Sequence, residues 1–95
     1  MDRSGASDLT FSGLILSLAT TAAFHFGDLE DPETGRPAEP DLDSAGRIIE
    51  VLTMLQEKTR GNLIPEEDRV LDDLLYELRM RFVQASSAGK RIVEP

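Results

Sequence analysis

The feature that most constrains this chain is the run from Leu9 to Gly27, LTFSGLILSLATTAAFHFG, which contains no Asp, Glu, Lys or Arg. Charged residues make up 29% of the whole chain, so nineteen uncharged residues in succession require burial or a partner. A membrane-spanning helix needs about 20 apolar residues and favours cationic or aromatic flanks. This run includes five hydroxyl residues, a histidine and two glycines, and Asp8 and Asp28 flank it. We therefore expect a buried helix of a globular fold rather than a membrane span.

Within this run we predict a first helix over residues 10–26. Thr10 is a suitable N-cap because its hydroxyl can accept a hydrogen bond from a backbone N–H one turn later, and Gly27 can adopt the left-handed conformation that ends a helix. Apolar residues form two stripes along the helix. The first stripe contains Phe11, Leu14, Ile15, Leu18 and Ala22, and the second contains Leu16, Ala19, Ala23 and Phe26. A helix that is apolar on two sides is buried on two sides, so one stripe can pack within the chain and the other favours a second subunit.

Two glycines lie inside predicted helices, Gly13 in the first and Gly46 in the second. Each costs about 1 kcal/mol relative to alanine in a helix interior. Gly13 continues into a seam of small residues with Ser17 and the pair Thr20 and Thr21, and small side chains let two helices approach closely. We therefore expect a close helix crossing, which would be contradicted if Gly13→Leu left stability and assembly unchanged.

Residues 28–41, DLEDPETGRPAEPD, are predicted to form an irregular acidic loop, because they contain three prolines, a glycine and six acidic residues. The DPETG stretch, residues 31–35, is typical of a turn. A cation site is the alternative reading, but Pro32 occupies the third ligand position of an EF-hand loop and no Glu completes that pattern. We interpret the loop as a solvated acidic segment, and keep a cation-responsive loop as a hypothesis that Ca²⁺- or Mg²⁺-dependent melting would test.

A second helix is predicted over residues 42–60, with Asp41 or Asp43 as its N-cap and Gly61 at its end. Its apolar positions follow helical spacing at Ala45, Ile48, Leu52 and Leu55, widened by Ile49, Val51 and Met54. Because only a few residues separate it from the next helix, we expect the two to form an antiparallel hairpin.

A third helix is predicted over residues 65–85, beginning at Pro65 and followed by two glutamates. Its inward side chains are expected to be Val70, Leu71, Leu74, Leu75, Leu78, Phe82 and Val83. Its outward side chains include Asp68, Asp72, Asp73, Glu77, Arg79 and Arg81, with Glu77 and Arg81 as an i, i+4 ion pair. Residues 1–9 are expected to be flexible and residues 86–95 to be a frayed tail.

The predicted fold is therefore all-α, a single three-helix domain over residues 10–85 in which the apolar N-terminal helix packs on a C-terminal antiparallel helical hairpin. A 95-residue chain buries only a small core, so its stability as a monomer is marginal. Disulfides, bound metals or oligomerisation usually stabilise such a chain further. The chain has no cysteine, which excludes disulfides and thiolate metal sites, so association with another chain is the remaining way to add stability. The lack of cysteine is also compatible with a cytoplasmic location.

Charge and composition argue against several function classes. The net charge of −8 disfavours binding to nucleic acid and to anionic lipid headgroups. His25 is the only histidine, and no further ligands follow at helical spacing, so we read it as a residue that stabilises the helix end, with Asp28 able to hydrogen-bond to it. No phosphate-binding loop, dinucleotide fingerprint or HExxH motif is present. We expect no catalytic, cofactor-binding or metal-binding residues, and no targeting peptide in the polar start MDRSGASD.

Three segments, FSGLILSLATTAAFHFGD, DPETG and IIEVLTMLQEKTRGNLIPEEDRVLDDLLYELRMRFV, together resemble the bacterial DUF1844 family. The most specific parts are the connection from Glu57 to Glu67 and the LLYELRMRFV end of the third helix. In similar sequences the residue before Pro65 is often Thr, whereas here it is Ile64, which replaces an N-cap hydroxyl worth about 0.5–2 kcal/mol. The resemblance implies a small, all-helical, cytosolic protein and brings no assigned activity.

The function hypothesis is a non-enzymatic protein–protein interaction or assembly module that self-associates, with another protein as the alternative partner. The residues expected at its interface are Phe11, Leu14, Leu16, Leu18 and Phe26. Two alternatives remain open. The same residues can be plain intramolecular core, or the first helix can dock a peripheral membrane protein onto lipid, and flotation with liposomes separates the second alternative from an assembly module.

Overall fold

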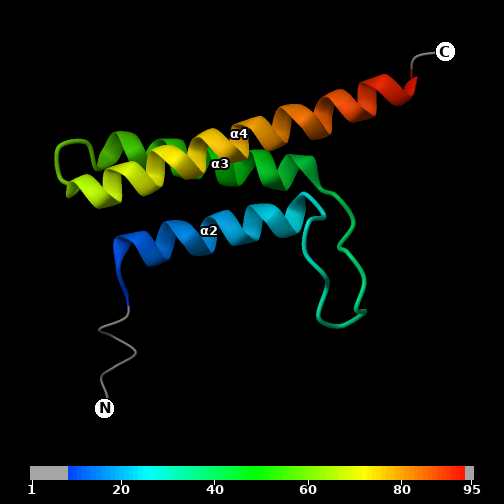
Figure 1. Cartoon of the computed structure of the whole chain (residues 1–95), viewed down its shortest axis with the longest axis horizontal. Coiled ribbons are helices and arrows are strands. Elements are labelled where there is room, and N and C mark those ends of the chain that lie inside the picture. The colour runs from blue at the N-terminus through cyan, green and yellow to red at the C-terminus, as the bar shows by residue number, and fades with distance from the viewer. Residues whose placement is uncertain (1–8, 94–95) are drawn as a thin grey trace.

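The computed structural model describes residues 9–93, which form three helices in the order α2 (Phe11–His25), α3 (Leu42–Lys58) and α4 (Pro65–Val93) (Figure 1). Helix α3 runs antiparallel to α4 and to α2, so α2 and α4 point in the same direction. The predicted all-α domain, an apolar first helix on an antiparallel hairpin, is confirmed. Of the segment predicted to be flexible, residues 1–8 lie outside the described part of the chain.

The helix ends follow from local sequence signals. The Thr10 hydroxyl accepts a hydrogen bond of 2.9 Å from a backbone N–H of the first turn of α2. The Asp41 carboxylate caps α3 by accepting from the Ser44 N–H at 3.1 Å and from the Ser44 hydroxyl at 2.8 Å, and these bonds lower the pKa of Asp41. Gly27 and Gly61 adopt φ angles of +83° and +85° after α2 and α3. These caps and stops are the predicted ones.

Helix α4 begins without a hydroxyl cap, as Ile64 implies. The Ile64 carbonyl accepts from the Asp68 N–H at 3.0 Å, which is the first bond of the helix. The Glu67 carboxylate reaches back and accepts from the Ile64 N–H at 3.1 Å. Glu67 therefore supplies one half of a capping box, and the half that a Ser or Thr hydroxyl would supply is missing.

The C-terminal end of α4 differs from the prediction. The sequence pattern predicts that residues 86–95 fray, but the helix continues to Val93, eight residues beyond the predicted end at residue 85. No proline interrupts the backbone hydrogen bonds between Pro65 and Val93. The described helix therefore continues beyond the point where the apolar periodicity stops and extends past the beginning of α3 (Figure 1), whereas residues 94–95 of the predicted tail lie outside the described residues.

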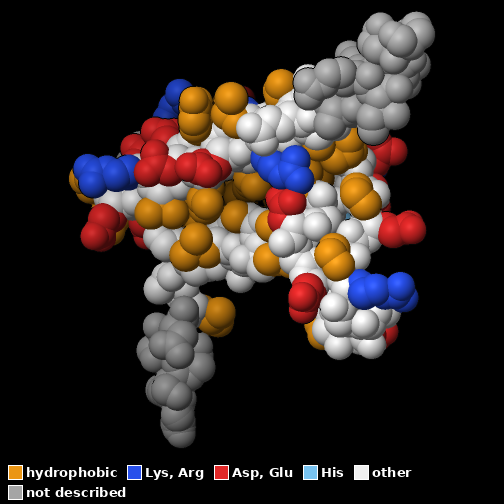
Figure 2. Space-filling view, turned by 45° about the vertical axis from the view of Figure 1, so that its right-hand side comes forward, with side chains coloured by type: hydrophobic (Ala, Val, Ile, Leu, Met, Phe, Trp, Pro, Cys, Tyr) orange, Lys and Arg blue, Asp and Glu red, His pale blue; other side chains and the backbone are white. Residues whose placement is uncertain are grey.

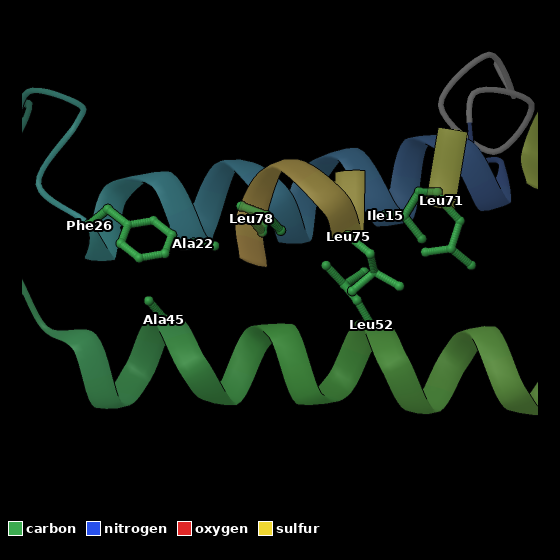
Figure 3. Packing of buried hydrophobic residues seen from close by; sticks show 8 residues of the cluster. All are labelled: Ile15, Ala22, Phe26, Ala45, Leu52, Leu71, Leu75 and Leu78. Carbon is green, nitrogen blue, oxygen red and sulfur yellow. The ribbon is translucent and has the colours of Figure 1, made fainter. Parts of the chain in front are cut away.

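All three helices contribute to one core. Among the residues whose burial is described, the eight buried in this core are Ile15, Ala22, Phe26, Ala45, Leu52, Leu71, Leu75 and Leu78 (Figure 3). Gly46 allows α3 and α4 to approach closely, because a Cβ at this position would lie 3.3 Å from Cε1 of the Phe82 ring. This close approach joins α3 and α4, and the close crossing expected along the seam of Gly13, Ser17, Thr20 and Thr21 stays a prediction.

Polar contacts fasten α4 to the other two helices. On the α3 side, the Arg79 guanidinium donates to the Thr53 hydroxyl at 2.8 Å. On the α2 side, Arg81 donates twice to the Asp28 carboxylate, from Nε at 2.9 Å and from Nη2 at 2.7 Å. Arg81 thus pairs across the fold rather than with Glu77, and the Asp28 carboxylate binds Arg81 rather than His25. Both differences arise because α2 ends beside α4, a proximity that no local sequence pattern encodes.

The acidic loop is folded back on itself. Backbone hydrogen bonds join Asp31 N to Arg36 O at 2.7 Å and Ala38 N to Leu29 O at 3.2 Å. The loop turns at Gly35, whose φ is +72°, as the DPETG pattern predicts. At its base the Asp41 N–H donates to a carbonyl of the last residue of α2 at 2.6 Å, so the two ends of the loop are held together.

Candidate protein interface on helix α2

One side of α2 forms part of the core. Ile15, Ala22 and Phe26 are buried, and Phe11 and Leu18 are partly buried against them. The stripe pattern assigns Phe26 to the side that faces a second subunit, but Phe26 is only 3% exposed within the single chain. Eleven residues of helix return to within about 20° of the starting direction, so Phe26 shares the side of Ile15 and not that of Leu16. Phe26 is therefore unavailable to a partner.

The other two interface candidates remain on the surface. Leu14 is 49% exposed and Leu16 is 50% exposed. Two residues correspond to about 200° of helix rotation, so these leucines lie at opposite edges of the side that faces away from the core. We call this side the outer face of α2, and its residues are Gly13, Leu14, Leu16, Ser17, Thr20, Thr21 and Phe24.

The outer face is less polar than its composition indicates. The Thr20 hydroxyl donates to the Leu16 carbonyl at 3.0 Å, and the Thr21 hydroxyl donates to the Ser17 carbonyl at 3.1 Å. Each threonine therefore satisfies its donor within its own helix. A partner that covers these residues need not supply an acceptor for either hydroxyl group.

Phe24 lies at the C-terminal end of the outer face. It is two residues from both Ala22 and Phe26, which are buried, and therefore points away from the core. Its ring is partly buried and meets the His25 imidazole edge-on, with centroids 6.0 Å apart. The face thus begins with a glycine and ends with an aromatic ring.

No charged side chain lies on the outer face, and the Asp28 carboxylate just beyond the helix is paired with Arg81. The two bonds from Arg81 lower the pKa of the Asp28 carboxyl, so the pair stays ionised. Figure 2 shows hydrophobic side chains gathered across the middle of this view, with basic and acidic side chains side by side near its centre as well as around the margins. The electrostatic setting of α2 is therefore that of an uncharged strip on an acidic molecule.

A second exposed apolar surface lies on α4, where the sequence pattern does not predict one. Tyr76, Met80 and Val83 lie one and two turns apart and are 67%, 45% and 56% exposed. The prediction that Val83 faces inward is therefore wrong. The i, i+4, i+7 spacing of the three residues is visible in the sequence, but the core pattern of the same helix obscures it.

An open hollow of about 290 Å³ lies between α3 and α4, lined by Gly46, Ile49, Glu50, Arg79, Phe82 and Val83. Phe82, whose ring lies close to Gly46, is one of these lining residues. Glu50 and Arg79 are the charged groups among these lining residues, and Arg79 is engaged by Thr53. The hollow thus offers a shallow apolar surface rather than a set of converging polar groups.

Among the residues that the structure describes, no group of three or more His, Cys, Asp or Glu side chains is placed to hold a metal ion. In the acidic loop, the Asp31 carboxylate instead accepts from the Glu33 N–H at 2.9 Å. None of the three helices, over the part of the chain that is described, is long and apolar enough to cross a membrane.

Residues 8–84 match the family described as domain of unknown function (DUF1844). The match covers most of the chain, and the chain belongs to this family. No curated protein and no solved structure matches it.

Proposed function

We propose that this member of the DUF1844 family is a non-enzymatic assembly module that self-associates through the outer face of α2. The observation that carries the proposal is the character of this face. In a chain with 29% charged residues it has no charge, and half-exposed leucines lie along both of its edges. A monomer gains nothing from exposing these leucines on an uncharged strip, whereas an interface gains from burying them.

A second copy of the chain is the partner that the charge distribution favours. Each copy carries a net charge of −8, and copies that meet through charged surfaces repel each other. On the outer face of α2, two copies can meet without bringing like charges into contact. The contact would be isologous, with the same residues on both copies, as in most twofold dimers.

The size of the face sets the expected strength. A 15-residue helix is about 22 Å long and about 10 Å wide, which gives a footprint of roughly 220 Å² per copy. Stable interfaces bury about 800 Å² per partner. We therefore expect a concentration-dependent dimer in the micromolar range or weaker, and we expect added salt to strengthen it by screening the repulsion.

Sedimentation velocity over a dilution series tests the proposal. Leu16→Glu should shift the chain to monomer, because it adds a carboxylate to each side of the contact, where loss of hydration and like-charge repulsion oppose association. Met54→Glu is the matched control, since Met54 is 44% exposed but lies on α3, and it should leave the dimer intact. Circular dichroism melting of both variants separates loss of assembly from loss of folding. A wild-type chain that stays monomeric at every concentration would contradict the proposal.

The same variants distinguish lipid docking. If α2 docks on a bilayer, a monomeric chain should float with zwitterionic vesicles and Leu16→Glu should abolish flotation. An assembly module should stay in the soluble fraction. The proposal includes a cytoplasmic location, which the absence of cysteine supports and which cell fractionation tests.

A further inference from the structure

The middle line of the outer face has a large residue at one end and the smallest residue at the other. Gly13, Ser17, Thr20 and Phe24 follow one another at i, i+4, i+7 and i+11, so they lie on a single line along α2. Gly13 and Phe24 are equally distant from the midpoint between Ser17 and Thr20. The two end positions are placed symmetrically but carry side chains of very different size. A second copy of the helix therefore packs differently on this line when it runs parallel than when it runs antiparallel.

In an antiparallel pair centred on the midpoint, Phe24 lies opposite Gly13 of the partner subunit and Ser17 lies opposite Thr20 of the partner subunit. Large then meets small at both ends. In a parallel pair, the two phenylalanines meet at one end and the two glycines leave a gap at the other. The antiparallel arrangement also sets the helix dipoles in opposite directions.

We infer that two copies associate with their α2 helices antiparallel, and that Phe24 of each copy occupies the notch at Gly13 of the partner subunit. This inference rests on the proposed function. Two observations beyond the spacing support it. Phe24 points away from the core and is neither a core residue nor one of those packed against the core, although its partly buried ring meets His25, and Gly13 lies in regular helix, where the backbone does not require a glycine.

Spin-label distances test the direction. The chain has no cysteine, so Leu9→Cys, at a position that is 84% exposed just before α2, gives a single nitroxide site. At 1.5 Å per residue, two labels in an antiparallel dimer would lie roughly 30 Å apart, and in a parallel dimer roughly 10 Å. A pulsed dipolar measurement that finds the short distance would overturn the inference.

A mixed sample provides the internal control. Leu29→Cys places a label just beyond the other end of α2, at a position that is 40% exposed. In an antiparallel dimer of one Leu9→Cys chain with one Leu29→Cys chain, the two labels lie within roughly 15 Å, because their distances from the midpoint differ by one residue. In a parallel dimer this mixed distance is the long one, at roughly 30 Å.

Exchange of the large and small residues tests the contact itself. Gly13→Leu should weaken association at least tenfold, because the leucine meets Phe24 of the partner subunit. Adding Phe24→Ala to Gly13→Leu should recover most of the affinity, since large and small residues have then changed ends. In a parallel dimer the two leucines would meet each other and Phe24→Ala would give no rescue.

The outcomes separate the two proposals. A chain that is monomeric in sedimentation overturns the proposed self-association together with this inference. A dimer that Leu16→Glu disrupts, but that shows the short Leu9 distance and no rescue, supports the proposed function and overturns the antiparallel contact. A dimer with the long Leu9 distance, the short mixed distance and rescue supports both.

Discussion

The ion pair between Asp28 and Arg81 joins the end of α2 to α4 across 53 residues of sequence, and its removal should weaken the fold by a defined amount. The side chains are 40% and 35% exposed, so solvent screens the attraction, and a pair of this kind contributes about 0.5–1 kcal/mol. Arg81 also lies over the Phe26 ring, 5.2 Å from its centroid, which adds about 0.5–1 kcal/mol at an exposed site. Asp28→Asn should therefore cost about 0.5–1 kcal/mol and Arg81→Ala about 1–2 kcal/mol.

Urea unfolding followed by circular dichroism measures these losses. In a double-mutant cycle, the coupling between the two positions should be about 0.5–1 kcal/mol at pH 7. Asp73→Asn, which removes an exposed carboxylate of α4, is the control and should stay within about 0.5 kcal/mol of the wild type. A coupling of zero, or Arg81→Ala no more harmful than Asp28→Asn, would refute the reasoning.

The pH dependence of the coupling has a definite sign. Hydrogen bonds from Arg81 lower the folded-state pKa of Asp28 below its usual 3.8. A carboxyl with a lowered pKa contributes its stability above the unfolded pKa and loses it as the pH falls through the folded pKa. The coupling should therefore be constant from pH 6 to 8 and disappear progressively below about pH 4. A coupling that persists unchanged in strong acid would show that the interaction is not ionic.

Three further substitutions probe the core, the loop base and a helix cap. Leu52→Ala, at a position with no exposed surface, should cost about 2–5 kcal/mol and lower the melting temperature by more than about 8 °C, whereas Met54→Ala should cost far less. Gly27→Ala should destabilise the chain more than Gly35→Ala, because both glycines have positive φ but a Cβ at Gly27 would lie 2.9 Å from a loop carbonyl oxygen, while Gly35 has open space. Equal melting temperatures for these two variants would contradict the packing of the loop on α2. Ile64→Thr should raise stability by about 0.5–1 kcal/mol by completing the capping box, as thermal melting would show.

The parts of the fold that sequence can predict are those decided by neighbouring residues. A cap needs only a hydroxyl or carboxylate within one turn, so the predicted caps Thr10 and Asp41 are correct. Which side of α2 faces the core is harder to predict. Each step of three or four residues misses a full turn by some tens of degrees, and these offsets accumulate along a stripe. Phe26, ten residues after Leu16, lies about 80° away from it and only about 20° from the side of Ile15. The stripe pattern therefore places Leu16 correctly and Phe26 wrongly.

The same division applies to the candidate site: features set by neighbouring residues can be predicted from the sequence, and features set by distant contacts cannot. The absence of charge on α2 is a property of the sequence alone, and it predicts either burial or a partner. Which leucines remain exposed depends on the positions of α3 and α4, and therefore on contacts between distant residues. The pairing of Arg81 with Asp28 belongs to this second class, since Glu77 offers a local partner at i−4 that the tertiary fold overrides.

The geometry of α2 makes folding and association separable. Its core side carries Ile15, Ala22 and Phe26, whereas the proposed contact uses residues about 180° away, none of which lies in the eight-residue core. A change on the outer face can then alter the dimer without a matching change in the monomer. Gly13→Leu is the extreme case, because removing a glycine from a helix interior stabilises the helix while the larger side chain blocks the contact. We therefore expect Gly13→Leu to melt at a higher temperature as a monomer and yet to associate more weakly. A role of Gly13 in the monomer fold alone would not produce this combination.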